Sequence, residues 1–158
     1  MRFDEQGMLR TLIPPGSIRF ILSIVCSIIS LVSALALVIL VFGRQLNSDL
    51  LAKLIVVIFI IGVFGIVHPN FRLTRGEKWP LTYMSVLLLS CILITSITLI
   101  WSYFDGLEDV YAGGALGLVF GVLGLWGYRS KALEKLRSHF DQVWQDEYQK
   151  REHLRKGR

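Results

Sequence analysis

The stretch YAGGALGLVFGVLGLWGY, residues 111–128, contains six glycines in eighteen residues. Glycine weakens a helix in water by about 1 kcal/mol relative to alanine, so the stretch is a phosphate-binding loop, a series of tight turns, or a helix inside a membrane. It contains no GxGxxG pattern and follows no strand-and-turn pattern, which argues against a dinucleotide-binding loop. We therefore predict a membrane-spanning helix.

The glycines of this stretch are regularly spaced. Gly113, Gly117 and Gly121 recur every four residues, and Gly124 follows three residues later. Residues at these spacings share one face of a helix, and small residues on such a face let a neighbouring helix come close in a bilayer. We predict that this face packs against another helix, which belongs either to the same chain or to another subunit of a homo-oligomer.

The composition of the whole chain favours a membrane protein. It is 53% hydrophobic and 18% charged, whereas a soluble domain is usually about 45–50% apolar and about 25% charged. Nine of the 17 Lys and Arg residues lie in residues 129–158. The rest of the chain therefore contains long runs with almost no charge, as expected of membrane-spanning segments.

Four apolar runs predict four membrane-spanning helices, each close to the length of about 20 residues that a bilayer requires. They cover approximately residues 17–42, 50–68, 81–104 and 110–128. Pro69 is expected to end the second helix, because proline lacks the N–H group that a helix interior uses. The predicted fold class is therefore an all-α integral membrane protein with four transmembrane helices and a cytoplasmic C-terminal amphipathic helix.

The expected organisation has three parts. They are a cytoplasmic or interfacial segment at 1–16, the transmembrane domain at 17–128 and a charged amphipathic helix at 129–158. Lys and Arg residues gather in cytoplasmic segments of membrane proteins, and 15 of them fall on the side of the two termini against two on the other side. We expect a multi-pass protein of a bacterial inner (cytoplasmic) membrane with both termini in the cytoplasm.

Small polar residues form two further stripes at helical spacing. The stripes consist of Ser23, Ser27, Ser30 and Ala34 in the first run, and of Cys91, Thr95, Thr98 and Ser102 in the third. Such stripes usually pack helices together, with hydroxyls bonded to carbonyls of their own helix. The alternative is a polar path through the membrane, in which case the protein is a small channel, pore or transporter.

The charged tail has an apolar face at helical spacing. The residues on this face, which we predict to bind a partner, are Leu133, Leu136, Phe140, Val143, Trp144 and Tyr148. No other cytoplasmic segment is expected to cover them. The face is expected to lie on the membrane surface, to pair with its copies in a coiled coil, or to dock on a cytoplasmic protein. We expect no nucleic-acid binding, because the tail's nine basic and five acidic residues leave a net charge of only +4.

No pattern of catalytic, metal-binding or cofactor-binding residues is found in the sequence. It lacks HExxH and P-loop motifs, and its three histidines have no partners at zinc-site spacing. We therefore expect a non-enzymatic oligomeric scaffold or sensor that recruits or regulates a cytoplasmic partner, with a stress or anti-phage defence role suiting that design. An immunity protein against a pore-forming toxin is a further alternative.

Overall fold

The computed structural model describes residue 14 and residues 16–43 and 47–156. Its elements are α2 (Ser17–Phe42), α3 (Ser48–Leu73), α4 (Trp79–Phe104), the 3₁₀ helix η2 (Glu108–Val110), α5 (Tyr111–Tyr128) and α6 (Lys131–Lys156). No strand occurs within these ranges. The helices α2, α3, α4 and α5 are long and apolar enough to cross a membrane, which indicates a multi-pass membrane protein. The prediction of an all-helical fold with four spans is thus confirmed, whereas most of the predicted N-terminal segment 1–16 lies outside the described residues.

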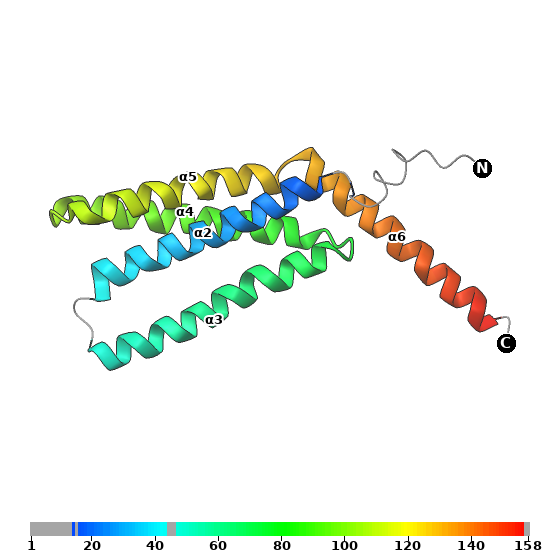
Figure 1. The fold of residues 1–158 in the computed structure, drawn as a ribbon, viewed down its shortest axis with the longest axis horizontal. Helices are drawn as coiled ribbons and strands as arrows, with labels where there is room; N and C mark the ends of the chain where they lie inside the picture. The colour runs from blue at the N-terminus through cyan, green and yellow to red at the C-terminus, as the bar shows by residue number, and fades with distance from the viewer. Residues whose placement is uncertain (1–13, 15, 44–46, 157–158) are drawn as a thin grey trace.

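The core of the bundle lies between α2, α4 and α5, which run side by side (Figure 1). Each of these helices buries residues that alternate three and four positions apart, which is the 3.5-residue spacing of left-handed helix packing. The buried positions are Ser23, Cys26, Ser27, Ser30, Ala34, Leu37 and Val41 on α2, Met84, Leu88, Cys91, Thr95, Thr98 and Ser102 on α4, and Gly114, Gly117, Gly121, Gly124 and Tyr128 on α5. Most of these side chains are small, so the helix backbones can approach closely.

Helix α3 diverges from α2 along much of its length (Figure 1). Its buried residues are Ile66, Pro69, Asn70 and Leu73, all near its C-terminal end. The remainder presents apolar side chains on all sides, as expected of a helix surrounded by lipid. The bundle is therefore compact at the end where α3 meets α4, and open between α2 and α3.

The prediction that Pro69 ends this helix is wrong, because α3 continues to Leu73 with the proline inside it. A side chain one residue further on stabilises this last turn. The Asn70 side-chain amide donates to the carbonyl of Ile66 at 2.8 Å, and its Oδ1 accepts a hydrogen bond from the Tyr128 hydroxyl at 2.8 Å. The carbonyl that Pro69 leaves without its usual N–H partner is that of Gly65, one turn back. Proline is nevertheless tolerated inside membrane helices.

Helix α6 leaves the end of the bundle at which α3 and α4 are joined (Figure 1). We call this the tail end of the bundle, formed by residues 16–17, the loop 74–78 and residues 128–131. The first half of α6 contacts this end, and the second half projects away from it.

Candidate functional site

The glycine face of α5 packs inside the chain. A Cβ atom at Gly117 would lie 2.8 Å from Ser33 of α2, and one at Gly121 would lie 2.8 Å from Ile92 of α4 and 2.9 Å from the Ser30 hydroxyl. At Gly124 the nearest atoms belong to Leu88 of α4, at 3.2 Å, and to Cys26 of α2. The neighbours of these three glycines in the structure are therefore two helices of the same chain.

The prediction that Gly113 lies on the packing face of α5 is wrong. Gly113 is exposed, and a Cβ atom there would meet no atom of the described residues within 4 Å. The buried glycine is Gly114, which packs against Leu99. A seam between left-handed packed helices alternates steps of three and four residues, so a constant step of four leads out of it. Gly127, which packs against Ser23, was also missed.

The serine stripe of α2 lies in the same interface. Ser23 and Ser27 are buried, and their hydroxyls donate to the carbonyls of Arg19 and Ser23, each at 2.7 Å. Ser30 is fully buried, and its hydroxyl has no hydrogen-bond partner among the described residues. On α4, Thr98 and Ser102 likewise donate to carbonyls one turn back, at 2.8 Å. Thr95 of α4, like Ser30, is fully buried and its hydroxyl has no hydrogen-bond partner among the described residues. Both stripes thus lie at the contacts between helices of the same chain.

The start of α6 is docked on the bundle. Leu133 and Leu136 are each 0% exposed, and Leu133 belongs to the same apolar cluster as Leu73, Met84 and Tyr128. The expectation that no other segment covers these two leucines is therefore wrong. Leu136 lies beside Gly16 at the start of α2, and the residues clustered with Leu133 come from α3, α4 and α5.

Two polar side chains of α6 bond to backbone carbonyls of the loop 74–78. Arg137 is 9% exposed and donates from Nη1 to the carbonyl of Gly76 at 3.1 Å. Trp144 donates from its indole Nε1 to the carbonyl of Thr74 at 3.0 Å. The guanidinium of Arg75 lies over the Trp144 ring, 5.9 Å from its centroid. These contacts fix both the position and the rotation of α6, because each side chain reaches one particular carbonyl.

Two glycines with positive φ allow the close approach of α6. Gly16 has φ 97° and Gly76 has φ 83°, values that residues with a Cβ atom rarely adopt. A Cβ atom at Gly16 would lie 2.5 Å from the carbonyl oxygen of Ala132, and one at Gly76 would lie 2.6 Å from the Cα of Asp141. Both positions therefore require glycine, first because of the positive φ and second because a side chain would clash with α6.

The loop 74–78 is held by an ionic contact at its base. Arg72 donates from Nη1 to Oε1 of Glu77 at 2.8 Å, and the indole of Trp79 donates to the other carboxylate oxygen. The hydrogen bond from Trp79 lowers the pKa of Glu77, and the hydrogen bond and charge of Arg72 add to that effect. Glu77 thus stays ionised, and it holds the loop whose carbonyls receive α6.

Sequence reasoning missed four of these residues: Asn70, Gly76, Glu77 and Arg137. A signal for two of them was present in the pattern. Asn70 is an amide at the end of an apolar run, and Arg137 interrupts the apolar face of the tail between Leu133 and Phe140. A polar residue at a buried position usually has a specific hydrogen-bond partner. The partners themselves are 58 and 61 residues distant in sequence and were not predictable.

The second half of α6 has no cover among the described residues. Phe140 is half-buried, whereas Val143 is 47% exposed, Tyr148 68% and Leu154 74%. A helix turns by about 100° per residue, so these side chains continue the face that carries Leu133. The predicted partner-binding residues are therefore divided. Leu133 and Leu136 are buried against the bundle, Phe140 is half-buried, and Val143, Trp144 and Tyr148 are exposed, although Trp144 keeps its hydrogen bond to the loop 74–78.

Comparison of the chain with protein-family models, curated proteins and solved structures found no match. In the described ranges no three His, Cys, Asp or Glu residues lie together as a metal site would require. The geometry thus offers one distinctive arrangement, which is a helix docked at its start and exposed beyond it.

Proposed function

We propose that this protein is a scaffold or sensor of a bacterial inner membrane, without catalytic activity, whose C-terminal helix recruits or regulates a cytoplasmic protein. The observation that carries the proposal is the division of α6 at Trp144. Its first half is bonded to the loop 74–78, and its second half projects from the bundle with exposed apolar side chains. The membrane domain thus holds a binding helix at a fixed position.

The distribution of charge supports a cytoplasmic location for α6. The loop 74–78 and the basic tail lie at the tail end of the bundle, whereas the connection between α4 and α5 at the other end contains no Lys or Arg. Positive residues close to membrane helices favour the cytoplasmic side. We infer that the tail end of the bundle and both termini lie in the cytoplasm.

A protein partner fits the exposed half of α6 better than a membrane surface does. This half mixes three acidic residues with four basic ones, so it lacks the large excess of positive charge that holds a helix on an anionic lipid surface. Arg151 forms an ion pair with Glu147 at 2.9 Å, a type of contact that supports an isolated helix in water. Exposed Tyr148 and Leu154 are suitable anchors for a groove that accepts a helix.

Assembly of several copies belongs to the proposal, but through a surface other than the glycine face. The space beside Gly117, Gly121 and Gly124 is occupied by α2 and α4 of the same chain. The surfaces that the proposal leaves for a second copy are the outer faces of the spans.

The proposal is tested by photocrosslinking in cells. A photoreactive amino acid replaces Tyr148 or Leu154 on the proposed binding face, and the matched control replaces Gln142, which is exposed on the opposite face. We expect adducts with one cytoplasmic protein from positions 148 and 154, and none with that protein from 142. Adducts with lipid or with a second copy, or equal adducts from all three positions, would contradict recruitment by this face.

A further inference from the structure

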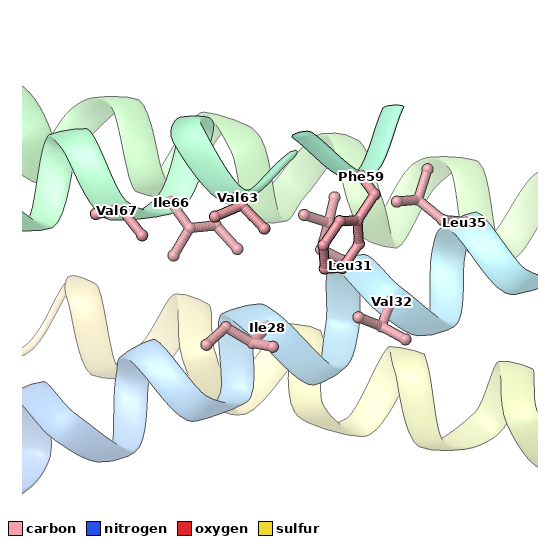
Figure 2. A pocket seen from close by; sticks show the side chains of 8 residues that line it. All are labelled: Ile28, Leu31, Val32, Leu35, Phe59, Val63, Ile66 and Val67. Atoms are coloured by element: carbon pink, nitrogen blue, oxygen red, sulfur yellow. The ribbon is translucent and has the colours of Figure 1, made fainter. Parts of the chain in front are cut away.

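An apolar groove lies between α2 and α3, near the middle of both 26-residue helices. Figure 2 shows side chains of the two helices pointing toward one another across it. The lining residues are Ile28, Leu31, Val32 and Leu35 of α2 and Phe59, Val63, Ile66 and Val67 of α3. All eight are hydrocarbon side chains, so the groove has no group that would recognise a polar ligand.

The groove has a defined floor and open sides. Ile66 is 3% exposed and forms its most buried part, whereas Val32 and Phe59 are 50% and 58% exposed at its rims. At Gly62 a Cβ atom would lie 2.9 Å from a methyl group of Leu31, so this glycine lets the two helices approach at one point. The groove is therefore an indentation between diverging helices that remains open toward the surrounding bilayer.

The size of the groove distinguishes between its conceivable occupants. Its volume is about 130 Å³, which is close to that of an engineered apolar cavity that binds benzene, about 150 Å³. A whole helix with its side chains is about 10–12 Å in diameter and is too wide to enter, so another protein could fill the groove only with single side chains. The lining extends over eight residues of α2 and nine of α3, or roughly 10–12 Å along the axes.

These dimensions match a hydrocarbon chain. One leaflet of a bilayer contributes about 15 Å of hydrocarbon depth, half of a core about 30 Å thick. The groove lies at the middle of the spans, where the ends of lipid acyl chains lie and headgroups do not reach. We propose that the groove is a binding site for the distal part of an acyl chain of a membrane phospholipid. This site is independent of the partner proposed for α6.

The test uses a phospholipid with a photoreactive diazirine in the distal half of one acyl chain. The full chain is reconstituted in phosphatidylethanolamine–phosphatidylglycerol vesicles with this probe, irradiated and analysed by peptide mass spectrometry. We expect labelling to concentrate in residues 28–35 and 59–67. Val63→Trp fills the groove and should reduce labelling on the order of tenfold, because the occupant loses its contacts with the walls.

The matched control is Ile97→Trp on the outer face of α4, where Ile97 is 63% exposed and lies outside the groove. This variant should leave the labelling of the groove unchanged. Ile28→Trp, on the opposite wall, gives a second test if the Val63 variant fails to insert. Equal labelling of all outward faces, unchanged labelling in both groove variants, or crosslinks from the groove to a second copy of the chain would overturn the proposal.

Discussion

At the scale of single residues, the neighbours of each α5 glycine decide what a larger side chain would cost. A Cβ atom at Gly121 meets Ile92 and Ser30 within 3 Å, whereas one at Gly113 meets no described atom within 4 Å. The two positions lie on the same helix and differ in this environment. They therefore form a matched pair for substitution.

We predict that Gly121→Leu lowers the thermal stability of the membrane domain in detergent by several degrees or prevents its assembly, because overpacking a tight interface costs about 1–3 kcal/mol or more. Gly113→Leu should leave the melting temperature unchanged or raise it slightly, since leucine favours a helix over glycine by roughly 1 kcal/mol. Thermal unfolding followed by circular dichroism measures both. Equal melting temperatures for the two variants would show that the glycine face is not the seam.

Glu77 gives the tail end of the bundle a dependence on pH. Hydrogen bonds from Trp79 and Arg72 lower its pKa in the folded protein. Its contribution to stability is therefore complete above the ordinary pKa of glutamate and is lost as the pH falls through the lowered value. We predict that the docking of α6 weakens in this acidic range, as measured by the protection of amides 131–141 against hydrogen exchange after correction for the intrinsic pH dependence of exchange.

Glu77→Gln serves as the control for this prediction. Glutamine keeps the shape of the side chain but has no charge, so α6 docking in this variant should be weaker at neutral pH and should change less on acidification. An identical acid response in the two proteins would exclude Glu77 as the titrating group.

At the scale of elements, α6 consists of a docked part and an exposed part. Leu136 is 0% exposed, whereas Leu154 is 74% exposed on the same helix. We predict that Leu136→Ala reduces the stability of the docked state by about 2–5 kcal/mol, the usual cost of truncating a buried leucine. The expected result is faster amide hydrogen exchange in residues 131–141, which report the opening of this contact.

Leu154→Ala should leave exchange in residues 131–141 unchanged, because this side chain has few contacts to lose. If the Leu136 variant also exchanged at the original rate, α6 would not be docked in the way described.

The spans and most positions of their small-residue packing faces were predictable from sequence, but the partners of contacts distant in sequence were not. Length and hydropathy determine a membrane helix, because a bilayer requires about 20 apolar residues whatever the neighbours are. Helix α3 extends past Pro69, and Asn70 in that last turn bonds to Tyr128 of α5, a partner 58 residues away that no local pattern indicates. Leu136 is buried beside Gly16, which is distant in sequence, so the local pattern predicted an apolar face but not the segment that covers it.

At the scale of the whole molecule, the proposal requires that α6 lies in the cytoplasm. Cys26 and Cys91 are buried, so cysteines introduced at the surface can be labelled selectively. We predict that Asp105→Cys reacts with a membrane-impermeant maleimide on cells with a permeabilised outer membrane, and that Lys131→Cys reacts only after the inner membrane is broken. The opposite pattern would place α6 outside.

The central claim is that the membrane domain holds α6 in place so that its exposed half binds a cytoplasmic partner. The most direct measurement is native mass spectrometry of the protein extracted from its own membrane in nanodiscs, comparing the wild-type chain with a Tyr148→Ala, Leu154→Ala double variant. We predict a second protein at a fixed ratio to the wild-type chain, and its loss from the double variant while the membrane domain keeps its own mass. A wild-type assembly containing only this chain, or the same partner content in both proteins, would contradict the account.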